Sequence, residues 1–140
     1  MRARYVAILL TLGVFRVPLT SFENLLQALH NHSLSEYPRE ACGIVTRDFT
    51  YIPCKNISSQ PKTSFVIDPL AMLQHEDNIW GFYHSHPGSA DPIPSKRDLE
   101  STVFTEYKFL VGFAGSVYIY WLNEANSLSF EKFNENHCTL

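Results

Sequence analysis

One stretch of the chain reads His84-Ser85-His86-Pro87 and, after the seven residues 88–94, Ser95-Lys96-Arg97-Asp98. Residues i and i+2 of a strand point to the same face, so His84 and His86 at a strand end would present two imidazoles to one metal ion. On a helix they would diverge by about 200°. The apolar run Ile79 to Tyr83 is typical of such a strand. Residues 87–94 include three prolines and cannot be regular structure, so we expect them to turn the chain and let the next helix bring Asp98 to the same ion.

These three side chains offer two imidazole nitrogens and one carboxylate. Three protein ligands, with a fourth position left to water, are the arrangement of a catalytic zinc site. The set suits Zn²⁺ better than Mg²⁺ or Ca²⁺, which prefer oxygen ligands. We therefore predict one Zn²⁺ per chain, held by His84, His86 and Asp98. The Ser95-x-x-Asp98 pattern is also that of a helix-capping box, and the two roles are compatible.

Amide hydrolysis at such a site needs a group that takes a proton from water and delivers it to the leaving nitrogen. Glu40 is the candidate, because it lies in Pro38-Arg39-Glu40-Ala41-Cys42-Gly43, directly before a predicted strand. The hydroxyl of Ser95 is a candidate donor to the oxyanion. Ser85 is expected to be a structural hydroxyl, since the sequence offers it no acid–base partner.

The motif of the JAMM (MPN-plus) metalloproteases is Glu, then His-Ser/Thr-His-Pro, seven residues and Ser-x-x-Asp. This chain resembles it in Glu40, His84-Ser85-His86-Pro87 and Ser95-x-x-Asp98. The resemblance implies a cytidine-deaminase-like α/β fold, one zinc ion on His84, His86 and Asp98, Glu40 as general acid/base and Ser95 at the oxyanion.

The likeness covers about residues 21–122 and is nearest to the JAMM domain of phage tail assembly proteins of the lambda K type. It is carried further by Tyr37–Gly43, Tyr51–Asn56 and Phe65–Pro69. Tail proteins of this type usually have a cysteine-peptidase domain after the JAMM domain, and we expect no room for one within 140 residues.

The remaining pattern predicts one layered α/β domain with a mixed, mostly antiparallel sheet flanked by helices. Apolar residues at helical spacing predict a helix from Thr20 to about Asn31, opened by a Thr20–Glu23 capping box and followed by a polar break over Ser33–Pro38. Two further short helices are expected, at Pro69–Leu73 and Ser95–Phe104. Besides the strand before His84, the expected strands are Cys42–Val45 paired with Tyr51–Pro53, Phe65–Ile67, Phe109–Phe113, Ser116–Leu122 and Ser127–Glu131. We place the JAMM/MPN domain at residues 20–135 and a C-terminal tail at residues 136–140.

Residues 1–19 could be read either as an export signal or as part of the folded protein. The apolar run Tyr5 to Phe15 follows Arg2 and Arg4, as in an export signal, but Arg16 comes directly after it and no cleavage site is evident. The run is also far short of the roughly 20 residues that span a bilayer. We favour an N-terminal extension or a buried first strand over export. Three widely spaced cysteines fit a reducing compartment, so we expect a cytoplasmic protein of a bacterium or a phage-infected cell.

The composition excludes several partners. The 140 residues are 45% hydrophobic and 18% charged, with a formal charge of −3 and no block of like charges, so a nucleic-acid or membrane partner is not expected. Of the other histidines, His30 and His32 face apart at a helix end and are left off the metal, whereas His75 and His137 are expected at the surface. Cys42 and Cys54 are expected to be small core residues.

These observations predict a zinc-dependent metallopeptidase or isopeptidase that hydrolyses an amide or isopeptide bond of a protein or peptide through a zinc-activated water, in phage tail assembly. One alternative is a protease that processes or deconjugates a ubiquitin-like or sulfur-carrier protein. Another, from a different class, is a non-catalytic scaffold of MPN type, although that class typically has degraded metal residues and here all are intact. The sequence predicts neither the particular substrate nor the oligomeric state.

Overall fold

The structure is a computed structural model that describes residues 5–10, 13–102 and 106–134. Its elements, in chain order, are β1 (Tyr5–Leu10), β2 (Gly13–Pro18), α1 (Leu19–Glu36), β3 (Cys42–Thr46), β4 (Tyr51–Cys54), α2 (Pro69–His75), a 3-10 turn η1 (Glu76–Asn78), β5 (Ile79–Ser85), α3 (Lys96–Glu100), β6 (Lys108–Phe113), β7 (Ser116–Leu122) and β8 (Leu128–Asn134).

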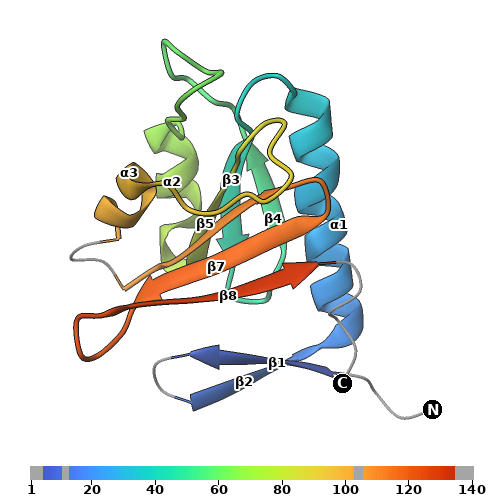
Figure 1. The fold of residues 1–140 in the computed structure, drawn as a ribbon, viewed down its shortest axis with the longest axis vertical. Coiled ribbons are helices and arrows are strands. Elements are labelled where there is room, and N and C mark those ends of the chain that lie inside the picture. Colours follow the sequence, from blue (N-terminus) through green and yellow to red (C-terminus); the bar gives the residue numbers. More distant parts are fainter. Residues whose placement is uncertain (1–4, 11–12, 103–105, 135–140) are drawn as a thin grey trace.

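A six-stranded sheet with the order β4-β3-β5-β6-β7-β8 forms the centre of the molecule. Its neighbouring strands run antiparallel except for β5 and β6, which are parallel. Helix α1 covers one face, and α2 and α3 lie on the other side (Figure 1). The predicted mixed, mostly antiparallel sheet with flanking helices is confirmed.

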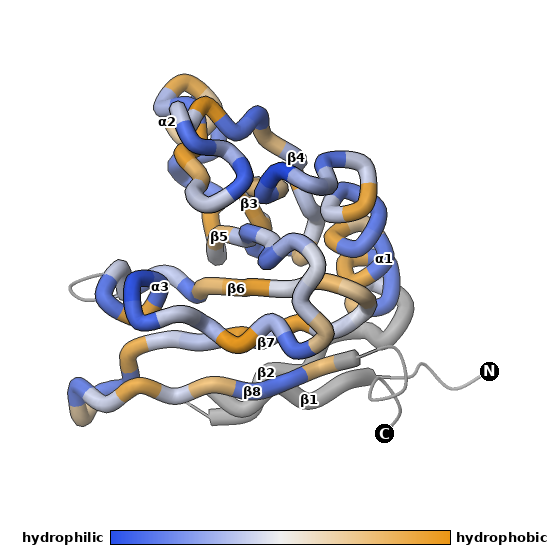
Figure 2. The backbone as a smooth tube through the Cα atoms, turned by 45° about the horizontal axis from the view of Figure 1, so that its top comes forward, coloured by the Kyte–Doolittle hydropathy of each residue, from blue (hydrophilic) through white to orange (hydrophobic). Residues whose placement is uncertain are grey.

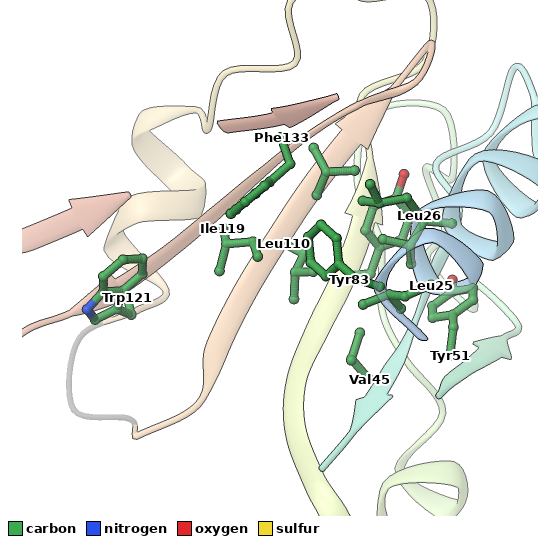
Figure 3. Close-up of a cluster of buried hydrophobic side chains, with 12 residues drawn as sticks. Leu25, Leu26, Val45, Tyr51, Tyr83, Leu110, Ile119, Trp121 and Phe133 are labelled. Atoms are coloured by element: carbon green, nitrogen blue, oxygen red, sulfur yellow. The ribbon is translucent and has the colours of Figure 1, made fainter. Parts of the chain in front are cut away.

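The main core lies between α1 and the sheet. Phe22, Leu25 and Leu29 are at most 2% exposed, and Leu25 and Leu26 face Val45 and Tyr83 of the sheet (Figure 3). Burying each of these side chains contributes roughly 1.5–3 kcal/mol. Figure 2 shows hydrophobic and hydrophilic turns alternating along α1, whereas β6, in the middle of the sheet, is hydrophobic along most of its length.

Helix α1 is longer than the sequence pattern predicts. It ends at Glu36 instead of Asn31, and it begins at Leu19, so Thr20 lies inside its first turn and not before it. The predicted polar break at Ser33 is wrong because this side chain is buried and satisfied: its Oγ donates to the Leu29 carbonyl and lies 2.6 Å from the Tyr83 hydroxyl. A polar residue with two such partners can continue a helix into the core.

The N-terminal apolar run also differs from the prediction. Of the two alternatives, an N-terminal extension or a buried first strand, the single strand is not found: the run forms the antiparallel hairpin β1–β2, a two-stranded sheet of its own with Ile8 opposite Phe15. A run of this length exceeds the five or six residues of a typical strand, and Gly13 interrupts it, so the chain doubles back. In the part of the chain that the structure describes, no helix has the length and apolarity needed to cross a membrane.

Two short elements differ from the prediction: one expected strand is absent, and one expected helix is shorter. Phe65–Ile67 is not a strand, since it makes only one isolated bridge, between Ile67 and Asn56. Helix α3 ends at Glu100, because the Ser101 and Thr102 hydroxyls donate to the Arg97 and Leu99 carbonyls and compete with helix continuation. Residues 103 and 104 of that predicted helix, and the predicted tail 136–140, lie outside the described residues.

The other predicted elements are confirmed to within a few residues. These are the hairpin β3–β4, helix α2, and strands β5 to β8.

Candidate metal centre

The carboxyl end of β5 carries the two predicted histidine ligands. His84 lies in the strand and is buried, and His86 follows it, with its N–H donating to the Gly112 carbonyl of the parallel neighbour β6. The two imidazole centroids are 5.1 Å apart. The expected i, i+2 placement is therefore present, at the carboxyl end of a parallel strand pair, where ligand sites of open α/β sheets commonly lie.

The proline-rich loop leads from β5 to α3 and brings Asp98 to these histidines (Figure 1). One carboxylate oxygen, Oδ1, lies 3.1 Å from His84 Nε2, and the other, Oδ2, lies 3.0 Å from His86 Nε2. Burial alone raises the pKa of Asp98, but its interactions with His84 and His86 outweigh burial and hold this pKa far below its ordinary value. Asp98 is therefore ionised across the physiological pH range.

Asp98 also belongs to the capping box of α3. The Asp98 N–H donates to Ser95 Oγ at 3.1 Å, and Asp98 Oδ2 accepts from the Ser95 N–H at 2.8 Å. The capping box predicted from the Ser95-x-x-Asp98 pattern is therefore present, and the same carboxylate faces both histidines. Because the carboxylate accepts a hydrogen bond from the backbone N–H at the N-terminus of α3, the backbone sets its orientation toward the two histidines.

The donor atoms of His84, His86 and Asp98 all lie within 4.8 Å of one another. Ligand atoms around a tetrahedral Zn²⁺ with bonds of about 2.0–2.2 Å are roughly 3.3–3.6 Å apart. The distances of 3.1 and 3.0 Å from the Asp98 oxygens to His84 and His86 are slightly shorter than this spacing. The Nε2 atom of His84 is buried and, among the described residues, has no hydrogen bond of good geometry despite facing Asp98. Burial also lowers the pKa of His84, although Asp98 opposes this, and so favours the neutral imidazole that binds metals. These three residues could hold a divalent metal ion.

Glu40 lies two residues before β3, in the segment beside the end of β5. Its neighbour Ala41 is bonded to Ser85 twice: the Ala41 N–H donates to Ser85 Oγ at 2.8 Å, and the Ser85 N–H donates to the Ala41 carbonyl at 2.9 Å. Ser85 is fully buried, so the prediction that its hydroxyl is structural is confirmed.

The Glu40 carboxyl group is in an environment that favours its neutral form. Glu40 is only 7% exposed, and burial raises its pKa from 4.5 to about 7, an effect that His86 opposes and the Asp98 charge reinforces. A carboxyl group with a pKa near neutrality can both accept and deliver a proton, which is the property that general acid–base catalysis requires.

Sequence reasoning missed a contact that covers His84. The Phe65 ring stacks on the His84 imidazole, with centroids 4.5 Å apart and planes inclined by 16°. No local signal could have found it, since Phe65 lies on an irregular segment far from His84 in the sequence.

The same segment forms one wall of a cavity of about 340 Å³ that reaches His84 and Asp98. The rest of the lining is mainly aromatic and aliphatic: Val66, Ile67, Met72, Phe82, Phe109 and Tyr120, with Ser101. The carboxylate and imidazole of the candidate metal centre therefore open onto a largely apolar space.

The remaining histidines and cysteines lie elsewhere. His32 Nδ1 is 2.6 Å from the Tyr51 hydroxyl, and among the described residues neither His30 nor His32 belongs to the candidate metal-binding group. His75 is half-buried, and His137 lies outside the described residues. Cys42 and Cys54 are buried and unpaired, which confirms them as small core residues.

Sheet, flanking helices and the His-His-Asp group together define a protein of the JAB/MPN class. Residues 22–127 match the family of prokaryotic homologs of the JAB domain, and the chain belongs to that family. The resemblance seen in the motif is thereby confirmed.

Three relatives are similar to parts of this chain. Tail tip assembly protein K of Escherichia phage N15 is 37% identical over 83 residues, which are 54% of this chain and 33% of that protein. The desampylase of Haloferax volcanii is 28% identical over 102 residues, 64% of this chain and 73% of the enzyme. A probable TtuB-protein conjugate cleaving protease of Thermus thermophilus is 34% identical over 89 residues, 54% of this chain and 57% of that protein. The chain thus spans only a third of the tail protein's length.

Proposed function

We propose that this protein is a zinc-dependent metallopeptidase or isopeptidase that hydrolyses an amide or isopeptide bond in a protein substrate. The observation that carries the proposal is the convergence of His84, His86 and Asp98, with donor atoms within 4.8 Å of one another. The names of two relatives, a desampylase and a conjugate-cleaving protease, support it.

The chain's own residues have distinct roles in this reaction. His84, His86 and Asp98 would hold the Zn²⁺, which supplies Lewis-acid polarisation and makes water more acidic. Glu40 takes the proton from the attacking water as general base and then delivers it to the leaving amine nitrogen. Its pKa of about 7 suits both steps. Ser95 accepts a hydrogen bond from the Asp98 N–H and still has its own proton to donate to the oxyanion.

The apolar cavity beside the centre supports a protein substrate. Its volume of about 340 Å³ and its wall of Phe65, Val66 and Met72 suit an apolar side chain next to the scissile bond. Two settings use this chemistry: phage tail assembly, to which the name of the N15 relative points, and the removal of a ubiquitin-like protein, to which the names of the other two relatives point.

Metal analysis and a cleavage panel test the proposal. Purified protein is assayed for zinc and for cleavage of linear and isopeptide-linked ubiquitin-like fusions and of tail-tip proteins. We expect one zinc ion per chain, its loss in His86→Ala and Asp98→Ala, and its retention with loss of cleavage in Glu40→Gln. The exposed Glu124 provides a matched control, since Glu124→Gln makes the same carboxyl-to-amide change in the turn between β7 and β8.

The cleavage rates and the zinc content distinguish the proposed mechanism from its alternatives. A Glu40→Gln protein that cleaves at the wild-type rate would sink the mechanism. A wild-type protein that holds no zinc and cleaves no member of the panel would favour the non-catalytic scaffold instead. The substrate that is cleaved separates tail assembly from deconjugation.

A further inference from the structure

The side chain of Asn56 joins two segments of the candidate site. Asn56 follows β4, and its Nδ2 donates to the Glu40 carbonyl at 3.0 Å and to the Ser64 carbonyl at 3.0 Å, with a longer contact of 3.4 Å to the Pro61 carbonyl. A side-chain amide has two N–H hydrogens, so the two short contacts use its full donor capacity.

The other half of the amide is equally occupied. Asn56 Oδ1 accepts from the Ser58 N–H at 3.0 Å and from the Val66 N–H at 3.1 Å, which uses both lone pairs. Donors and acceptors lie on opposite sides, so neither a carboxylate nor a simple hydroxyl can replace this group. The full set of partners shows that the loop 57–66 folds around the Asn56 side chain.

The first segment that Asn56 holds contains Glu40. The register of β3 and β4, with Cys42 opposite Cys54, would set Glu40 opposite Asn56, but β4 ends at Cys54. At Glu40, hydrogen bonds with the Asn56 side chain and with the loop 57–66 therefore replace the backbone hydrogen bonds that a longer β4 would make. The Glu40 carbonyl accepts from Asn56, and the Glu40 N–H donates to the Pro61 carbonyl at 2.7 Å. Both backbone groups of Glu40 thus depend on the loop that Asn56 organises.

The second segment covers the metal ligand. Asn56 bonds to the main chain of Ser64 and Val66, on either side of Phe65, and Phe65 stacks on His84. A further main-chain bond, from the Ile57 N–H to the Val66 carbonyl at 3.0 Å, closes the loop. One amide group therefore connects the backbone of Glu40 to the aromatic cover of His84.

We infer that Asn56 is a positioning residue, which sets the placement of the Glu40 carboxyl group relative to the Phe65 ring over His84. The catalytic part of this inference rests on the proposed function. The structural part does not, because it concerns hydrogen bonds within the protein. Asn56 is not one of the three candidate metal ligands, and it contacts the cavity wall through the main-chain N–H of Val66. Its effect on the candidate site is therefore transmitted through the backbone of Glu40 and through the segment that carries Phe65.

The test compares zinc-loaded wild-type protein with Asn56→Ala and with Asn56→Asp, which keeps the shape and loses the two donors. Asn123 is the matched control: its Oδ1 accepts from the Ala125 and Ser127 N–H groups and its Nδ2 donates to Ser129 Oγ, in the turn between β7 and β8. Both asparagines therefore organise a loop, but only Asn56 does so beside the candidate site.

Three measurements are made: zinc content, amide hydrogen exchange, and kcat per folded molecule. For the Asn56 variants we expect zinc to be retained, exchange at the Glu40 and Val66 amides to be at least about tenfold faster, and kcat to fall about 10–100-fold. For Asn123→Ala we expect faster exchange only in the β7–β8 turn and a kcat within about twofold of wild type.

Unchanged protection at Glu40 and Val66 in the Asn56 variants would overturn the inference, as would a kcat per folded molecule equal to that of the wild type. If neither variant folds, exchange of the Asn56 side-chain amide protons in the wild type decides, since they must exchange more slowly than those of the exposed Asn31. A wild-type protein without hydrolytic activity would refute the proposed function, while the exchange data would still test the role of Asn56.

Discussion

Phe65 lies flat against His84, with the two rings inclined by only 16° and their centroids 4.5 Å apart. His84 is 3% exposed, so this ring is part of what removes water from a candidate metal ligand. Stacked aromatic pairs contribute about 0.5–1.5 kcal/mol beyond the area they bury. The irregular segment around Phe65 therefore contributes to the order of the His-His-Asp group.

Replacing Phe65 with alanine should weaken zinc binding. Without the ring, His84 becomes accessible to water and loses a contact that fixes its plane, and groups that orient metal ligands are typically worth 10–100-fold in affinity. We expect about a tenfold loss for Phe65→Ala and a smaller loss for Phe65→Leu, measured by competition with a chelator. Phe130, 58% exposed on β8, is the control. If Phe65→Ala binds zinc as tightly as Phe130→Ala, the contact has no role in holding the ligand.

The capping role of Ser95 can be separated from its proposed role at the oxyanion. Glycine at a helix N-cap costs only a few tenths of a kcal/mol relative to serine, whereas it removes the hydroxyl donor. Ser95→Gly should therefore keep its zinc and nearly all of its stability while kcat falls about 10²–10³-fold. Ser95→Thr keeps both cap and hydroxyl and serves as the control. Equal kcat values for the glycine and threonine variants would remove Ser95 from the reaction.

Glu40 makes the stability of the metal-free protein depend on pH. Burial raises its pKa from 4.5 in the unfolded chain to about 7 in the folded protein. The stabilising preference for the protonated form is fully present below pH 4.5 and is lost as the pH rises through about 7, because the folded protein then holds a buried carboxylate.

The measurement uses chelator-treated protein and its free energy of unfolding. The wild type should lose stability relative to Glu40→Gln between pH 4.5 and pH 8. The difference between the wild type and the exposed control Glu124→Gln should stay constant over the same range. A wild-type curve parallel to that of Glu40→Gln would show that Glu40 titrates normally.

The grouping of the candidate metal ligands was predictable because their placement follows from local periodicity. Two histidines at a strand end share a face, and an aspartate at the third position of a capping box returns toward the helix start, so His84, His86 and Asp98 could be grouped from spacing. Phe65 and Asn56 could not be found in this way. Their roles arise from the loop 57–66, whose shape depends on hydrogen bonds between residues distant in sequence, such as the Glu40 N–H with the Pro61 carbonyl.

The limits of the helices escaped prediction for a related reason. Ser33 reads as a helix breaker by composition, but in the fold its hydroxyl reaches Tyr83, which belongs to β5. Only the packing of α1 against the sheet reveals that partner.

Asp91, in the loop between His86 and Asp98, connects this loop to strands β7 and β8 by hydrogen bonds. Both the Tyr118 hydroxyl, on β7, and the Lys132 ammonium, on β8, donate to Asp91 Oδ1 at 2.9 Å. These hydrogen bonds, that from Lys132 foremost, lower the pKa of Asp91. Because this loop joins two candidate metal ligands, its opening would separate them.

Weakening the contact between Asp91 and Lys132 should speed the dissociation of zinc. Asp91→Asn keeps the side chain's shape but removes its charge, and exposed ion pairs of this kind are screened by salt and modest in strength. We expect zinc to dissociate about two- to fivefold faster from Asp91→Asn than from the wild type at low salt, with transfer to a chelator as the measurement. In about 1 M NaCl the difference should shrink, because screening weakens the wild-type contact with Lys132 as well. Asp77→Asn, an exposed carboxylate in η1, should match the wild type at both salt concentrations. Identical dissociation rates for all three proteins at low salt would mean that Asp91 does not hold the loop over the metal centre.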